Sequence, residues 1–212
     1  FVIFSGDIAF SGKAEEYQTA TEQFFEPLLD ACGLTAKQLF IVPGNHDLDR
    51  DEFEFLPHEL TEPLASDAKV QHWLTDDRRR SYLLGPFRSF SSFVKSYTCQ
   101  EQADYVNVRR MPIGEKQVAL LGLNSAWMCG RNKAQIGDKG FVILGEPQIH
   151  SVLDEISDAD LKIAVLHHPF DWMTEFDCNR IENRLLQGYD FILRGHQHKP
   201  KVEVTSGTSG NC

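Results

Sequence analysis

The amino-acid sequence predicts an α/β fold, and three observations support this class. Short apolar runs such as residues 1–4, 39–42 and 161–166 have the length of buried strands. Segments with apolar residues at helical spacing lie between these runs. Polar side chains follow directly after four of the apolar runs, and the carboxyl ends of strands are where α/β proteins present their sites.

The first 42 residues predict a strand, a helix and a second strand. Residues 1–4 form the first strand, and Gly6 permits a tight turn after it. The helix begins near Ser11, has acidic residues in its first turn and stops at Gly33. Its apolar positions follow helical spacing: Tyr17, Phe24, Phe25, Leu28, Leu29 and Cys32. With the strand over residues 39–42, this segment predicts a βαβ unit.

Residues 48–102 differ from their surroundings and predict a helical insertion. They are rich in charge and in large apolar residues, with helices expected over residues 65–74 and 86–97. The second helix has one apolar stripe: Phe87, Phe90, Phe93, Val94 and Tyr97. Because the segment follows Asp47 directly, we expect it beside the entrance to a site. A packing subdomain without substrate contact is the alternative.

The second half of the chain predicts further strands and helices. Strands over residues 103–109 and 117–124 are joined by a turn around residues 112–115. The later elements are an extended segment over 141–144, helices over 145–156 and 179–187, and strands over 161–166, 190–193 and 200–205.

Composition is that of an ordinary globular protein. The 212 residues, 42% hydrophobic and 25% charged, allow a single domain over residues 1–212 with a sizeable insertion. No apolar run approaches the length of a membrane helix, and no segment resembles a signal peptide. The net charge of −10 disfavours broad, non-specific binding of nucleic acid. Bound divalent metals would still supply a local positive charge.

The five cysteines include no C-x-x-C pair, and their odd number fits a reduced, cytoplasmic setting. The chain begins at Phe1 without a methionine, inside a strand-like run. We therefore expect the native N-terminus to lie upstream, so that the domain is truncated at this end.

Four polar clusters stand at the ends of apolar runs. They are Ser5-Gly6-Asp7, Gly44-Asn45-His46-Asp47, His167-His168-Pro169 and Gly195-His196-Gln197-His198. Together they hold five of the eight histidines, which is more than scattered packing would place there. Each cluster alone is a common turn or strand end. As a set, all on strand ends, they predict loops that converge on one metal site.

The clusters offer one carboxylate, one amide oxygen and three imidazoles as metal ligands: Asp7, Asn45, His167, His196 and His198. No cysteine lies nearby, so a thiolate-rich structural zinc site is not expected. Mixed oxygen and nitrogen ligands suit manganese, iron or zinc. A carboxylate can bridge two such ions, and paired metals are a standard device of phosphate ester chemistry.

These motifs resemble those of the calcineurin-like metallophosphoesterase superfamily. Gly6-Asp7, Gly44-Asn45-His46-Asp47 and Gly195-His196-Gln197-His198 match three of its motifs, and His167 matches the histidine that precedes the last one. The resemblance spans nearly the whole chain. It implies a sandwich of two mixed β-sheets flanked by helices, with the site at the strand ends.

The resemblance also implies roles for individual residues. Asp7 would bridge two divalent metals, and His198 would bind the first of them. The second would be completed by Asn45, His167 and His196. His46 would contact the phosphate and the leaving group, with Asp47 orienting it.

The implied function is hydrolysis of phosphoesters by a hydroxide that two metals activate, for example as a phosphodiesterase. The expected partner is a phosphoester, whether a small molecule, a nucleotide or a nucleic acid. No membrane partner is expected, and further domains of a longer chain are the other candidate partners. The family opens with an Asp-x-His pair for the first metal, and none precedes Asp7 here. We expect that pair in the upstream segment. Its absence there would favour the alternative, a catalytically impaired module that serves as a sensor or partner-binding domain.

Overall fold

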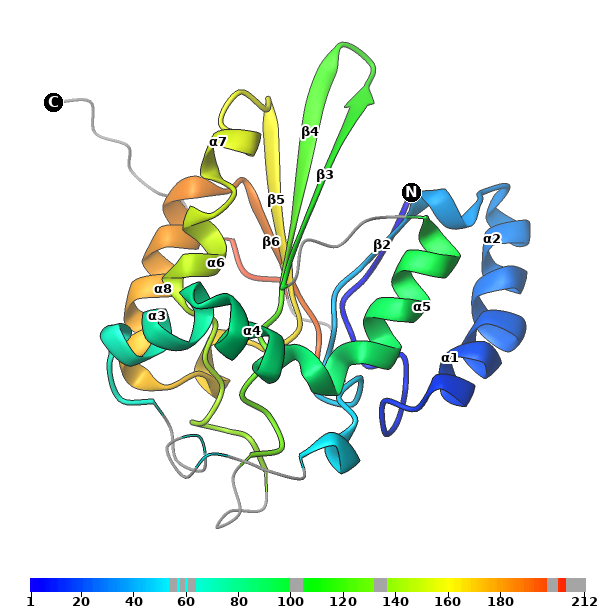
Figure 1. The fold of residues 1–212 in the computed structure, drawn as a ribbon. Helices are drawn as coiled ribbons and strands as arrows, with labels where there is room; N and C mark the ends of the chain where they lie inside the picture. The colour runs from blue at the N-terminus through cyan, green and yellow to red at the C-terminus, as the bar shows by residue number, and fades with distance from the viewer. Residues whose placement is uncertain are drawn as a thin grey trace, which may run out of the picture.

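Two β-sheets lie face to face between two layers of helices (Figure 1). The computed structural model describes residues 1–53, 57, 60, 64–99, 105–131, 137–197 and 202–204. The smaller sheet pairs β1 (Val2–Phe4) with β2 (Leu39–Ile41) in parallel. The larger sheet has the order β3-β4-β5-β6. Its strands are β3 (Val106–Ile113), β4 (Lys116–Leu123), β5 (Leu161–Leu166) and β6 (Phe191–Arg194).

The larger sheet is mixed, because β3 runs antiparallel to β4 while β5 and β6 continue parallel to it. The smaller sheet, in the described part of the chain, is purely parallel. The expected sandwich is confirmed, and the expectation that both sheets are mixed holds for the larger one only. The strand–helix–strand unit predicted for the first 42 residues is present as β1, the helices after it, and β2.

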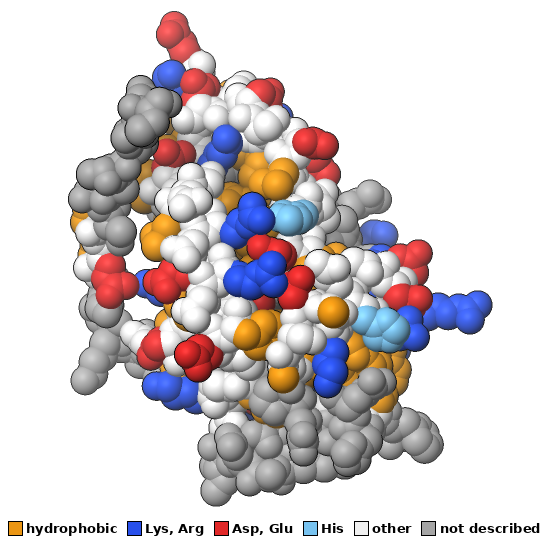
Figure 2. Space-filling view, turned by 90° about the vertical axis from the view of Figure 1, so that its left-hand side faces the viewer, with side chains coloured by type: hydrophobic (Ala, Val, Ile, Leu, Met, Phe, Trp, Pro, Cys, Tyr) orange, Lys and Arg blue, Asp and Glu red, His pale blue; other side chains and the backbone are white. Residues whose placement is uncertain are grey.

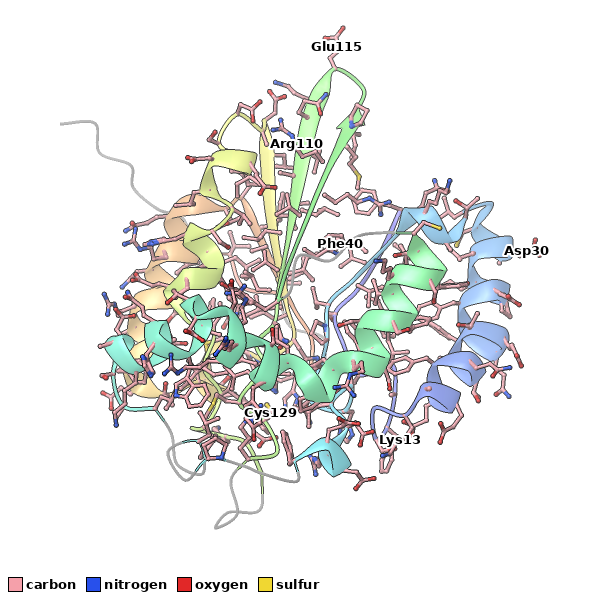
Figure 3. The ribbon with its side chains drawn as sticks, viewed as in Figure 1. Lys13, Asp30, Phe40, Arg110, Glu115 and Cys129 are labelled. Carbon is pink, nitrogen blue, oxygen red and sulfur yellow. The ribbon has the colours of Figure 1, made fainter. Side chains whose placement is uncertain are left out.

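A buried apolar layer joins the two sheets. Phe40 and Val42 lie opposite side chains from the larger sheet: Val118, Leu120, Ile163 and Val165. Figure 3 labels Phe40 in the space between the sheets. Side chains alternate along a strand, so the intervening residues face the helices and join the main core: Leu39, Ile41, Ala119, Leu121, Ala164 and Leu166. Burial on both faces explains why these strands are continuous apolar runs.

Helices cover the outer face of the smaller sheet (Figure 1). They are α1 (Ala14–Ala20), the π-helical segment η1 (Thr21–Phe25), α2 (Glu26–Cys32) and α5 (Arg88–Thr98). The single helix predicted before Gly33 is thus interrupted by a π-helical stretch. Gly33 ends it in the left-handed conformation, with φ of 65°. Tyr17 and Phe93 stack with ring centroids 5.0 Å apart, which fixes α1 against α5.

The helices predicted within residues 48–102 are confirmed to within about two residues. They are α3 (Asp67–Thr75) and α5, the latter preceded by the 3₁₀ turn η5 (Gly85–Phe87). A third helix, α4 (Asp77–Leu84), was not predicted, because three consecutive arginines obscure its apolar spacing. α3 packs on the opposite helical layer, where Gly145 leaves no room for a side chain: a Cβ there would lie 2.7 Å from Val70.

The second helical layer covers the outer face of the larger sheet. It contains α6 (Glu146–His150), α7 (Leu153–Ile156) and α8 (Glu175–Gly188). The helix predicted over residues 145–156 is therefore two short helices, and α8 begins four residues earlier than predicted. Residues 141–144 form no strand; Val142 makes only an isolated bridge to Met173. Of the strand predicted over residues 200–205, residues 202–204 are not in a strand and the rest lies outside the described residues.

Ion pairs tie α8 to its neighbours on this face. The Glu146 carboxylate lies 3.4 Å from Arg180 and 3.0 Å from Arg184, and Arg180 also lies 3.4 Å from Asp67 of α3. Figure 2 shows basic and acidic side chains gathered at the centre of the face. Because Glu146 is nearly buried, these pairs are less screened by solvent than isolated surface pairs. No helix in the described part of the chain is long and apolar enough to span a bilayer.

Candidate metal centre

The polar clusters meet where the carboxyl ends of the two sheets come together. β1 and β2 of the smaller sheet lead to Asp7 and Asn45. β5 and β6 of the larger sheet lead to His167 and His196. These are the lower ends of the strands in Figure 1, opposite the β3–β4 turn, which Glu115 marks in Figure 3. The fifth expected ligand, His198, lies outside the described residues.

Three potential metal-ligand atoms lie close to Nε2 of His167. It lies 3.1 Å from Asn45 Oδ1 and 3.1 Å from His196 Nδ1. It also lies 3.2 Å from Asp7 Oδ2. Ligand atoms that bind one ion at about 2.0–2.2 Å lie roughly 3 Å from one another, and each of the three distances to His167 Nε2 matches that spacing. The fold therefore places Asp7, Asn45 and His196 each within 3.2 Å of one nitrogen of the fourth predicted ligand, His167.

The tautomer of His167 is set by the chain just before Asp7. Its Nδ1 lies 2.7 Å from the carbonyl oxygen of Ser5, which can only accept, so Nδ1 carries the proton. In the neutral ring, Nε2 then presents a lone pair toward the oxygens of Asn45 and Asp7, which are acceptors as well. Acceptors that face one another repel, and a cation between them removes that repulsion. The donor set thus fits a divalent metal, with Ser5 orienting the ligand from behind.

Two of these ligands have unusual backbone conformations. Asp7 has φ of 59° and His196 has φ of 64°, a region that non-glycine residues adopt at a cost of about 1–2 kcal/mol. Two glycines of the same loops, Gly6 and Gly44, lie too close to other residues of the site to carry a side chain. A Cβ at Gly44 would overlap Oδ1 of Asp7, and one at Gly6 would lie 2.6 Å from His167 Nδ1. The glycines of the two motifs are therefore required by close approach of the loops.

Asp47 ties these loops together. Its side chain is fully buried, and its oxygens accept hydrogen bonds of 2.8 to 3.2 Å from the backbone amides of Asp7, Ile8, Ala9 and Gly44 and from the Tyr17 hydroxyl. Burial raises the pKa of Asp47 to about 6, although the amides lower it. Asp47 makes no hydrogen bond to the described side chain of His46. Asp47 therefore does not orient His46 through a direct hydrogen bond between their side chains; it positions the backbone of Asp7. The role expected for it in orienting His46 stays a prediction.

The carbonyl of Phe10 orients His46 instead. Nδ1 of His46 lies 2.8 Å from that oxygen and so carries the proton. The backbone amide of His46 donates to Asp7 Oδ1 at 3.0 Å. Nε2 has no hydrogen bond among the described residues, and His46 lines a hollow together with Phe10, Asn45 and Arg50. The residue type of Phe10 does not reveal this role, because the atom that contacts His46 is a backbone carbonyl oxygen.

The sequence profile described as Calcineurin-like phosphoesterase matches residues 1–200. The chain belongs to this family. One relative is an uncharacterized metallophosphoesterase-like protein, YydB of Bacillus subtilis (strain 168), which is 20% identical over 227 aligned positions. The alignment covers 100% of this chain and 43% of the relative, so the chain spans less than half of the curated relative's length. Calcineurin-like phosphoesterases generally bind divalent metals, in agreement with the donor set at His167.

This calcineurin-like phosphoesterase chain carries a second histidine that sequence analysis did not assign. His168 is fully buried, with Nδ1 2.9 Å from Ser125 Oγ and Nε2 3.6 Å from Cys129 Sγ. Burial, together with the charges of His167 and His196, holds its pKa well below the usual range. Its ring centroid lies 4.8 Å from that of His167. One nitrogen of His168 lies within 4.8 Å of nitrogens of His167 and His196, but both His168 nitrogens contact other side chains, Ser125 and Cys129. His168 is therefore a neutral ring packed beside the two ligands.

Asp7 is kept ionised by its surroundings. Partial burial raises the pKa of its carboxyl, but without a metal the hydrogen bond and charge of a doubly protonated His167 and the amide of His46 outweigh burial and lower the pKa to about 2. A cation bound between the two side chains would take the place of that proton. Because Oδ1 accepts from the His46 amide, Oδ2 is the oxygen that faces the His167 side.

Trp172 of the 3₁₀ turn η6 (Phe170–Trp172) packs against His196, with ring centroids 4.0 Å apart.

Proposed function

We propose that this chain hydrolyses phosphoesters at a centre of two divalent metals, manganese, iron or zinc. The observation that carries the proposal is the convergence of Asn45 Oδ1, His196 Nδ1 and Asp7 Oδ2 within 3.2 Å of His167 Nε2. These four residues would hold one ion. Asp7 would also reach the other ion, which His198 completes in this proposal. When bound, such ions supply positive charge for the phosphoryl oxygens and make water a better nucleophile near neutral pH.

His46 is the residue that we propose for proton transfer. Its ring is fixed through Nδ1 by the Phe10 carbonyl, Nε2 has no hydrogen bond among the described residues, and the residue lines the hollow. When protonated, Nε2–H can donate to a phosphoryl oxygen or to the leaving oxygen. The backbone amide of His46 also donates a hydrogen bond to Asp7 Oδ1 at 3.0 Å, so the proposed proton donor and the metal ligand are held at a fixed distance from each other. Asp47 acts behind both, by fixing the loop that carries Asp7.

Residues 48–102 are proposed as an insertion that borders the site. Support comes from Leu48, Asp49 and Arg50, which line the same hollow as His46. The helices that follow continue into both helical layers. A cytoplasmic location rests on the cysteine pattern alone and stays a prediction.

The test uses the full-length protein loaded with manganese. Hydrolysis of bis(p-nitrophenyl) phosphate and of p-nitrophenyl phosphate, measured side by side, tests the reaction and its finer form, a preference for diesters. His167→Ala should lose both bound metal and turnover. His150→Ala, an exposed histidine on α6, is the matched control and should retain both. Metal binding without turnover of either ester would contradict hydrolysis and favour a binding module. If the wild-type protein bound no metal, the proposed metal centre would be contradicted.

A further inference from the structure

Phe10 exposes its ring beside the candidate centre. It lies in the loop that follows Asp7 and leaves 80% of its surface accessible to solvent. Apolar surface of this size is normally removed from water, because burial stabilises the folded state. Other apolar side chains of this chain are exposed as well, so the position of Phe10 beside the centre, and not its exposure alone, makes its ring available to a bound molecule.

The loop around Phe10 is held firmly, so the exposure is not that of a loose segment. The three residues from Asp7 to Ala9 donate their amides to Asp47. The carbonyl of Phe10 accepts from His46 at 2.8 Å. Ser11 then donates its amide and hydroxyl to Glu16, at 3.0 and 3.1 Å. Hydrogen bonds on both sides thus present the ring outward in a defined place.

The ring lies next to the residue proposed for proton transfer. The ring centroids of Phe10 and His46 are 5.4 Å apart, with 30° between their planes. Both line one hollow, whose other walls include Asp49, Arg50 and Asp51. Lys13 pairs with both carboxylates, at 2.7 and 2.6 Å, so their charge is partly compensated. Phe10 therefore gives this hollow an apolar aromatic wall next to His46, with Leu48 and charged side chains lining the rest.

We propose that Phe10 packs against the leaving group of the substrate and that the site prefers phosphoesters of aromatic alcohols. This rests on the proposed function: if His46 donates to the leaving oxygen, the group attached to that oxygen lies beside His46, where Phe10 is. An aromatic leaving group stacks on the exposed ring and removes apolar surface of both from water. A small aliphatic group covers little of the ring and gains little.

The experiment compares an aryl and an ethyl ester of the same phosphate class in the manganese-loaded, full-length protein. Phe10→Ala should raise KM for the naphthyl ester about 3- to 10-fold, the range expected for loss of one aromatic pair. For the ethyl ester KM should change by less than about twofold, since little ring contact is lost. Phe10→Tyr keeps the ring and should restore the naphthyl KM. Phe191→Ala is the matched control, because this exposed phenylalanine begins β6 at the end opposite His196.

The outcomes separate the inference from the proposed function. Wild-type turnover of the ethyl ester, with equal effects of Phe10→Ala on both esters, would overturn the role of Phe10 and leave hydrolysis intact. No turnover of either ester by wild type would overturn both. Sedimentation of wild type and Phe10→Ala covers self-association: a dimer that the substitution dissociates, with unchanged kinetics, would assign the ring to a subunit contact and overturn the proposal.

Discussion

The Asp47 carboxylate accepts a hydrogen bond from the backbone amide of Asp7 at 2.8 Å, so a fully buried acid holds the residue that faces the candidate metal centre. The same carboxylate also receives the amide of Gly44, from the loop that carries Asn45. One buried side chain therefore sets the distance between the loops that follow β1 and β2.

Replacing Asp47 by alanine should destabilise the fold strongly. The change leaves the amides of Asp7, Ala9 and Gly44 without the carboxylate that accepts from them, and each unsatisfied group costs about 1–3 kcal/mol before water enters. The Tyr17 hydroxyl keeps the backbone carbonyl of residue 47 as its acceptor. Because water will reach part of the cavity, we expect a loss of about 3–4 kcal/mol in unfolding free energy, measured by denaturant titration. Asp30→Ala, on the exposed surface of α2, is the control. Equal stability of the two variants would contradict this assignment.

His46→Ala should reduce kcat about 100- to 1,000-fold while metal content stays near that of wild type. The side chain lies beside the donor set, whereas the anchoring of Asp7 uses the His46 amide, which alanine retains. If proton donation dominates, the defect shrinks for esters of acidic alcohols such as nitrophenol, because these leave without help. Metal analysis and the series of leaving groups are the measurements. Metal loss equal to that of Asn45→Ala would make His46 a ligand instead.

Gly44→Ala should impair metal binding. The new methyl group would overlap Oδ1 of Asp7 and lie 2.5 Å from its backbone nitrogen, so the Asp7 loop has to move. We expect a stability loss of about 2–3 kcal/mol, from overpacking, and at least tenfold weaker metal binding by titration calorimetry. Gly188→Ala is matched, because a Cβ there meets nothing within 4 Å. Unchanged metal affinity in Gly44→Ala would show that the loop tolerates displacement.

Asp177 should make stability fall as the pH rises from about 4 to 6. Burial raises the pKa of its carboxyl from 3.8 to about 6, with the charges of Asp67 and Glu146 adding to the rise and the amides of Leu144 and Gly145 opposing it. Between these two pKa values the folded state binds more protons than the unfolded state, so raising the pH favours unfolding, by about 2–3 kcal/mol in all.

Asp177→Asn removes that titration, and the comparison with wild type cancels the other groups. Unfolding free energies of wild type and Asp177→Asn are measured from pH 4 to pH 7. As the pH rises, wild type should lose more stability than the variant, so the two curves converge or cross. Parallel curves would mean that Asp177 stays ionised throughout.

The sequence by itself determined the fold class, most strands and the order of the ligand-type residues. Residues 39–42 and 161–166 are recognisable because strands buried on both faces must be apolar throughout. The chemistry of the clusters was recognisable because metals require particular donor atoms. By contrast, α4 was missed because three consecutive arginines obscure its apolar spacing, and no residue pattern marks the π-helical break in the first helix.

Only the tertiary structure decided how the site is held. His167 takes its tautomer from the carbonyl of Ser5, which lies 162 residues away in the chain. His46 is oriented by the carbonyl of Phe10, and Asp47 holds backbone amides rather than His46. Every residue has a backbone carbonyl and nearly every residue an amide, so residue type cannot reveal which of them are used. Such partners are set by how the two sheets pack, and that packing depends on the whole chain.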